Sequence, residues 1–135
     1  MIKRILCVVS DSDEEYFQKF HPTLKLLCKR HNLRLDRVKP EQLSETKIED
    51  EIMVMLFCSP ESLFYEDGFT EWVKHKQVRR VIIVKLRKSE ITESMLSTWV
   101  PIYGLGWYSD CASKSSESDD YLYRMSQALS KILNT

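Results

Sequence analysis

The chain has 135 residues, of which 43% are hydrophobic and 30% charged, a length and composition typical of one globular domain spanning residues 1–135. Its 20 Lys and Arg residues balance its 20 Asp and Glu residues, so no basic excess favours the phosphate backbone of a nucleic acid as a partner. No apolar run approaches the roughly 20 residues that span a bilayer, and we therefore expect no direct insertion into a membrane.

The cysteines and histidines provide no framework for a disulfide or a metal site. Cys7, Cys28, Cys58 and Cys111 are widely spaced, and three of them lie in apolar surroundings, where a free thiol packs as a small core residue. No CxxC pair occurs and the histidines are scattered, so we expect no metal and no cofactor. The apolar stretch after the basic N-terminus is too short for a secretory signal. The sequence therefore predicts reduced cysteines and a cytoplasmic location.

The first part of the chain predicts a strand, a helix and a second strand. Ile5–Val9 is a continuous apolar run, typical of a central parallel strand. Apolar residues at helical spacing then predict a helix that opens with a capping box at Ser12 and ends near Asn32, with a kink or a split at Pro22. Leu33–Val38 predicts the second strand.

The middle of the chain predicts a recognition loop and a parallel crossover. Lys39–Asp50 is polar and weakly anchored, which makes it a candidate recognition surface. Ile52–Phe57 and Val81–Val84 are continuous apolar runs that predict central strands. The charged segment Leu63–Gln77 between them predicts a helix with a break at Gly68.

The last third of the chain has weaker patterns until its end. Ile91–Trp99 has weak helical periodicity, Tyr103–Tyr108 predicts a short fifth strand, and the Ser-rich segment Ser109–Ser118 predicts a mobile loop. Capping residues from Ser118 then precede a docking helix over Leu122–Ile132. Strands that alternate with helices predict an α/β fold of the flavodoxin-like, doubly wound type, with about five parallel strands and helices on both faces.

Ligand sites of such sheets lie beyond the carboxyl ends of the strands. The residues to examine there are Ser10–Asp13, Cys58–Ser62 and Arg87–Lys88. The first of these segments lacks a Gly-rich phosphate-binding pattern, and helix capping accounts for its Ser and Asp residues. A nucleophilic cysteine in the second segment would need a partner base. Since none is identifiable, a structural cysteine is the simpler interpretation.

Several short motifs resemble those of one signalling family. Ile5–Ser10 followed by Asp13 is similar to its first box, an apolar strand that leads into a Ser and then an Asp. Met55–Leu63 is similar to its third-strand segment, in which the strand enters a Ser-Pro turn before a helix. Trp72 matches the Trp of that helix, and Trp107 matches the aromatic of the last box. On these motifs the chain resembles the Toll/interleukin-receptor (TIR) superfamily, including its SEFIR-like branch, over nearly its whole length.

The resemblance implies a module that self-associates or pairs with other TIR-type domains in a cytoplasmic signalling complex, as in innate immunity. Enzymatic TIR domains cleave NAD with a glutamate four residues after the matched Trp, and this chain has Lys76 there. The interaction interpretation therefore implies neither a catalytic residue nor a cofactor. The alternative is an NAD glycohydrolase, with NAD as substrate, in which Glu71, or else Glu61 or Glu66, is a displaced catalytic glutamate. A third interpretation is a structural domain within a larger assembly.

The predicted interaction surface consists of charged residues beside the edge of the sheet. An acidic group lies in the polar connection, and a basic cluster begins on the helix that follows. The acidic residues are Glu45, Glu49, Asp50 and Glu51, and the basic residues are Lys74, Lys76, Arg79 and Arg80. Complementary patches of this kind favour head-to-tail contact between copies.

Overall fold

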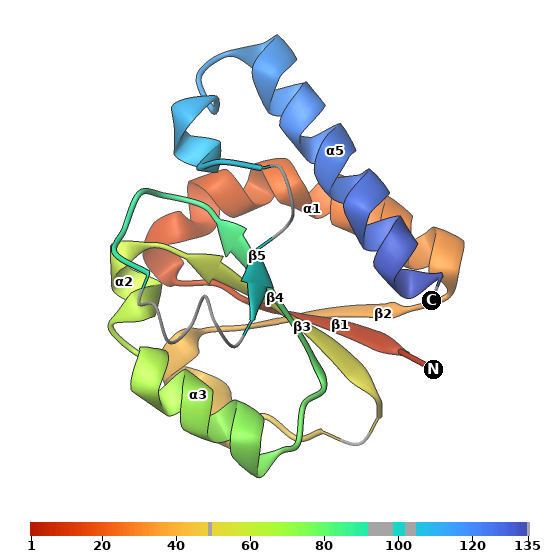
Figure 1. The fold of residues 1–135 in the computed structure, drawn as a ribbon, viewed down its shortest axis with the longest axis vertical. Helices are drawn as coiled ribbons and strands as arrows, with labels where there is room; N and C mark the ends of the chain where they lie inside the picture. Colours follow the sequence, from red (N-terminus) through yellow and green to blue (C-terminus); the bar gives the residue numbers. More distant parts are fainter. Residues whose placement is uncertain (49, 92–98, 102–104, 135) are drawn as a thin grey trace.

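The computed structural model describes residues 1–134 except 49, 92–98 and 102–104. It is an α/β structure in which helices cover both faces of a parallel sheet (Figure 1). The elements in chain order are β1 (Arg4–Val8), η1 (Asp11–Asp13), α1 (Glu14–His31), β2 (Arg34–Val38), η2 (Pro40–Glu45), β3 (Ile52–Cys58), α2 (Pro60–Leu63), α3 (Glu66–His75), β4 (Arg80–Lys85), β5 (Val100–Pro101), η3 (Tyr108–Asp110) and α5 (Ser115–Leu133).

Four parallel strands in the order β2-β1-β3-β4 form the body of the sheet, and the two-residue β5 pairs with β4. Every residue of β1 and β3 is buried, because each strand has a neighbour on both sides and helices above and below. The predicted first four strands are thus confirmed. The predicted strand Tyr103–Tyr108 is not, since residues 105–107 belong to no strand, Tyr108 begins η3, and 103–104 lie outside the described residues.

Successive side chains of each strand point to opposite faces of the sheet, so the core has two layers. On one face, Ile5, Met55 and Phe57 pack against α1 and α5. On the other face, Leu6 and Leu56 pack against α3 and η2. The continuous apolar runs therefore supply one layer on each side of the sheet.

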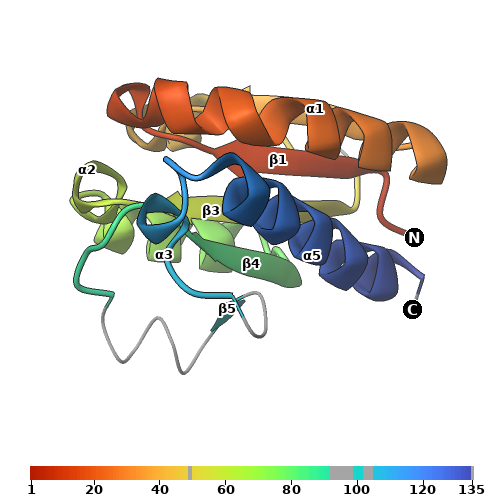
Figure 2. The same ribbon diagram turned by 90° about the horizontal axis from the view of Figure 1, so that it is seen from above.

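Aromatic side chains fill the layer beneath α1 and α5, which pack together on the same side of the strands (Figure 2). The ring of Phe20 meets those of Phe57, Tyr108 and Tyr121 edge to face, with centroid separations of 5.3, 4.8 and 6.2 Å. Such edge-to-face pairs add about 1 kcal/mol each to the burial of the rings. This cluster fixes the C-terminal helix against the first one.

The first helix differs from its prediction at two points. It is continuous through Pro22, which lies on its exposed side, so the expected split is not observed. It begins at Glu14, because Asp11–Asp13 forms a 3-10 turn, and the Ser12 hydroxyl pairs with that of Ser10 at 3.0 Å in place of capping the helix.

Other element boundaries also differ from the predicted ones. The break in the crossover lies at Phe64–Tyr65, and α3 runs through Gly68 because its buried residues, including Phe69, anchor that turn. The predicted mobile segment Ser109–Ser118 includes the first turn of α5, which begins at Ser115. Within the described residues, no helix is long and apolar enough to cross a membrane.

Candidate functional site

The winding of the sheet changes direction between β1 and β3. The chain leaves β1 for β2 on one side and then returns to form β3 on the other, so the carboxyl ends of β1 and β3 flank the switch point. Ligands of open α/β sheets bind at this position. The three segments predicted to meet there all follow the carboxyl ends of strands: Ser10–Asp13, Cys58–Ser62 and Arg87–Lys88.

Asp13 is the centre of a closed polar network at this edge. Its carboxylate is fully buried and accepts a hydrogen bond from the Ser59 hydroxyl (2.5 Å) and one from Nε of Arg87 (2.7 Å). The guanidinium of Arg87 also pairs with Glu61. Both oxygens of the buried carboxylate are therefore occupied from within the chain. Helix capping, the sequence-based explanation for Asp13, is wrong, because its side chain makes no cap hydrogen bond.

Ser59 and Ser62 close the same edge from the side of β3. The amide of Ser59 donates to the Ser62 hydroxyl (2.9 Å), and the amide of Ser62 donates to the Ser59 hydroxyl (3.3 Å), which makes a reciprocal cap for α2. The Ser62 hydroxyl in turn donates to the carbonyl of Phe57 (2.8 Å). The hydroxyls of Ser59 and Ser62 thus form hydrogen bonds with the backbone of the chain itself.

The cysteine at this edge is a poor nucleophile. Burial raises the pKa of the Cys58 thiol to about 12, and its sulfur faces the carbonyl of Leu56 at 3.8 Å. Because the thiolate is the reactive form, such a thiol is inert near neutral pH. Cys7 and Cys28 are also buried, Cys111 is half-buried, and no disulfide joins any of the four.

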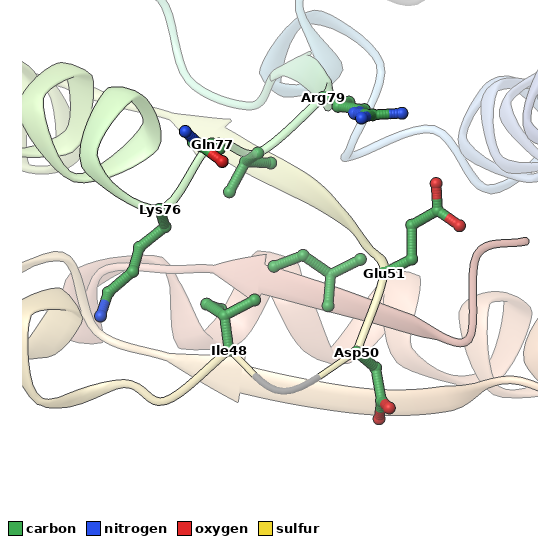
Figure 3. A pocket seen from close by; sticks show the side chains of 8 residues that line it. Ile48, Asp50, Glu51, Lys76, Gln77 and Arg79 are labelled. Atoms are coloured by element: carbon green, nitrogen blue, oxygen red, sulfur yellow. The ribbon is translucent and has the colours of Figure 1, made fainter.

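A pocket of about 310 Å³ lies at the opposite, amino edge of the sheet and gathers four of the predicted interaction residues: Asp50, Glu51, Lys76 and Arg79 (Figure 3). Asp50 and Lys76 point in different directions, and within the described residues no ion pair joins an acid to a base across this pocket. A hydrogen bond from the N-terminal amine, followed by the nearby charges of Arg79 and Arg80, lowers the pKa of Glu51.

The predicted acidic and basic patches therefore form one mixed edge. Arg80 lies beside Glu51 and Arg79 in a neighbouring hollow of about 610 Å³. Lys74 and Glu45 are exposed at the ends of α3 and η2, outside both hollows, and Glu49 lies outside the described residues. Acidic and basic side chains on one edge screen each other, which disfavours separate complementary patches at these positions.

A third hollow, of about 700 Å³, separates η2 from α3; we call it the η2/α3 groove. It is lined by residues of both elements and of the segments that flank α3: Pro40, Glu41, Leu43, Ser44, Phe64, Tyr65, Gly68, Glu71, Trp72, His75 and Lys76. The Phe64 side chain is 82% exposed at its rim and meets Tyr65 edge to face at 5.1 Å. Large exposed aromatic side chains are typical anchors of protein interfaces.

The residues of the NAD-cleavage alternative are distributed between two places. Glu71 is exposed and lines the groove, whereas its neighbour Trp72 is buried against Phe69. Lys76, which the resemblance aligns with the catalytic glutamate of enzymatic TIR domains, lines the same groove. Glu61 belongs to the Arg87 network at the carboxyl edge.

Two features of the structure are not predicted from the sequence. The pairing of Asp13 with Arg87 joins residues 74 positions apart, and only their positions after the carboxyl ends of the parallel strands β1 and β4 hint at it. The exposed pair Phe64 and Tyr65 falls within the segment for which the sequence predicts a helix. The cap at Ser59 is the available signal, because a four-residue helix that starts there ends just before the pair.

Among the residues that the structure describes, no His, Cys, Asp and Glu side chains gather in a group that could hold a metal ion. Comparison of the chain with family models, with curated proteins and with solved structures found no match.

Proposed function

We propose that this chain is a TIR-like protein–protein interaction module of a cytoplasmic signalling complex, which self-associates or pairs with other TIR-type domains. The proposal includes the flavodoxin-like, doubly wound class, whose order of strands the four-stranded body follows. Its basis is the set of motifs that resemble the TIR family together with the geometry of the surface.

One observation favours association over catalysis. The switch point, where such a sheet would hold a ligand, is closed by the bonds of Asp13 to Ser59 and Arg87. The exposed aromatic residue Phe64, by contrast, lies at the rim of an open groove. A fully buried carboxylate whose two oxygens both accept hydrogen bonds from the chain is shielded from a substrate, whereas an exposed aromatic side chain has apolar area to cover.

NAD cleavage is the second candidate, because the carboxylate of Glu71 is exposed in a hollow large enough for a small molecule. It is the weaker candidate, since Lys76 shares the groove and a cation there opposes an oxocarbenium-like transition state.

The experiment follows three properties of the purified protein: its mass by light scattering over a range of concentrations, its binding to isolated TIR-type domains, and its release of nicotinamide from NAD. We expect association or binding, and no cleavage above background. Phe64→Ser should weaken the contact about tenfold, because a central aromatic anchor contributes about 1 kcal/mol or more. Tyr123→Ser is the matched control, since Tyr123 is an exposed aromatic residue on α5.

A protein that stays monomeric and binds no TIR-type domain would refute the proposal. Nicotinamide release that Glu71→Gln abolishes would establish the enzymatic alternative. For the predicted edge residues, Lys76→Glu should change the affinity; an unchanged affinity would remove Lys76 from the interface.

A further inference from the structure

The balanced net charge of the chain conceals two segregated segments. Residues 16–35 contain no Asp or Glu, and residues 59–73 contain no Lys, Arg or His. The first segment includes most of α1, and the second includes α2 and most of α3. The two segments pack on opposite faces of the sheet, so the charge difference runs through the thickness of the molecule (Figure 1).

The outward side of α1 is basic and carries one exposed leucine. Leu26 is 48% exposed and shares a helical stripe with Lys19, Lys29 and Arg30 at intervals of three, four and seven residues. Lys25 is exposed beside it. None of these cationic side chains forms an ion pair within the described residues. The face thus presents a small apolar contact surrounded by unpaired positive charge.

The η2/α3 groove has the complementary character. Glu41 on the η2 wall and Glu71 on the α3 wall are exposed, and neither forms an ion pair within the part of the chain that the structure describes. The exposed Phe64 and the buried Leu43 add apolar side chains to the lining of the groove, and His75 and Lys76 line it at the C-terminal end of α3. Carboxylates that flank apolar surface fit a helix with lysines and an arginine around a leucine.

We propose that copies of this chain stack head to tail, with the basic outer face of α1 of one copy seated in the η2/α3 groove of the next. This interface rests on the proposed association function and specifies where it occurs. Because the two surfaces differ and lie on opposite faces, two joined copies still have one free surface of each kind between them. The contact is therefore heterologous and builds an open array rather than a closed dimer.

The test uses charge reversals on each side of the interface. Lys29→Glu and Glu71→Lys should each raise the concentration needed for assembly about tenfold, because each converts an attraction into a repulsion. An equal mixture of the two variants should restore assembly. In an alternating array, the carboxylate introduced on α1 of one variant meets the ammonium introduced in the groove of the other, and the native contact remains at the junctions between. Light scattering at low and moderate salt measures these changes, and salt should weaken the wild-type array.

Matched controls separate the interface from a general effect of charge. Lys131→Glu and Asp120→Lys reverse exposed charges on α5, which contributes no residue to either surface. Both should assemble like the wild type, and circular dichroism confirms that every variant is folded. Equal losses in the controls, or a mixture that fails to assemble, would overturn the stacking.

The outcomes also distinguish this interface from the proposed function. Wild-type assembly that all four variants leave unchanged, or a monomer that binds a TIR-type domain, would refute the α1-to-groove contact alone. A monomer that binds no such domain would refute both.

Discussion

The buried carboxylate of Asp13 joins three segments that are distant in sequence. It holds the end of β1, the cap of α2 through Ser59 and the segment after β4 through Arg87. A buried carboxylate is tolerated only when such partners replace its water. We therefore interpret the network as the closure of the carboxyl edge, a structural role.

We predict that Asp13→Asn lowers the free energy of unfolding by about 2–3 kcal/mol, because the amide removes the buried negative charge that pairs with Nε of Arg87 and presents a donor beside it. Urea unfolding measures the loss. Asp11→Asn is the matched control: the exposed Asp11 pairs with exposed Lys39 at 2.9 Å, and its replacement should have little effect. A stable Asp13→Asn variant would show that the network does not close the edge.

The sequence predicts that these three segments lie near one another, but not that their side chains pair. Parallel strands place their carboxyl ends at one edge, which follows from the alternation of strands and helices. Whether Asp13 faces inward depends on the 3-10 turn of Asp11–Asp13, and a capping pattern around Ser12 suggests a different geometry. The sequence pattern therefore predicts where the three segments lie but not which of their side chains pair.

Among the elements, long apolar runs are predicted best. β1, β3 and β4 are evident because burial on both faces requires continuous apolar sequence. Short elements such as η2 and α2 are missed or merged with their neighbours, because a single turn has no period to detect. The start of α5 at Ser115 is also missed. The hydrogen bond between the Tyr108 and Ser118 hydroxyls (2.6 Å), which ties that turn down, has no sequence signature.

Pro22 lies in the interior of α1, where it removes one backbone donor and leaves the carbonyl of Gln18 without its helical partner. Tertiary packing of the Phe17, Phe20 and Leu24 face holds the helix together in spite of this cost. We predict that Pro22→Ala raises the free energy of unfolding by about 1–2 kcal/mol, after the added freedom of the unfolded chain is subtracted.

Urea unfolding measures the stability of Pro22→Ala and of the control Lys25→Ala. The control replaces an exposed residue of the same helix and leaves the backbone hydrogen bonds intact. The control should differ little from the wild type. If Pro22→Ala is no more stable than the control, the proline fits α1 without strain.

At the scale of the whole molecule, the net charge of the chain does not indicate how charge is distributed over its surface. The balance of 20 basic and 20 acidic residues argues against a strongly charged partner, but the fold places the acid-free segment 16–35, which includes most of α1, on one face and the base-free segment 59–73, which includes α2 and most of α3, on the other. Asp50 and Glu51 of the predicted acidic group share one edge with Lys76 and Arg79 of the predicted basic cluster. Segregation along the chain becomes segregation in space only through the topology of the sheet.

Two ion pairs at the surface link elements across the molecule, and we expect them to contribute to the loss of stability in acid. Glu14 of α1 pairs with Arg37 of β2, and hydrogen bonds, first that from Arg37, lower the pKa of Glu14. A backbone hydrogen bond and then the charge of Arg87 lower the pKa of Glu61. A carboxyl whose pKa is lower in the folded state stabilises the fold at pH values above its unfolded pKa, and this contribution is lost as the pH falls through the folded value.

We therefore predict that Glu14→Gln/Glu61→Gln is less stable than the wild type at pH 7, and that the difference shrinks as the pH falls below the ordinary carboxyl pKa of 4.5. At low pH the wild-type carboxylates are protonated and resemble the amides that replace them. The control Glu45→Gln/Glu90→Gln removes the same formal charge from exposed side chains that form no ion pair within the described residues. Urea unfolding at each pH gives the three curves. If the curve of Glu14→Gln/Glu61→Gln runs parallel to that of the wild type across this range, these pairs do not carry the acid sensitivity, and the remaining carboxylates of the chain do.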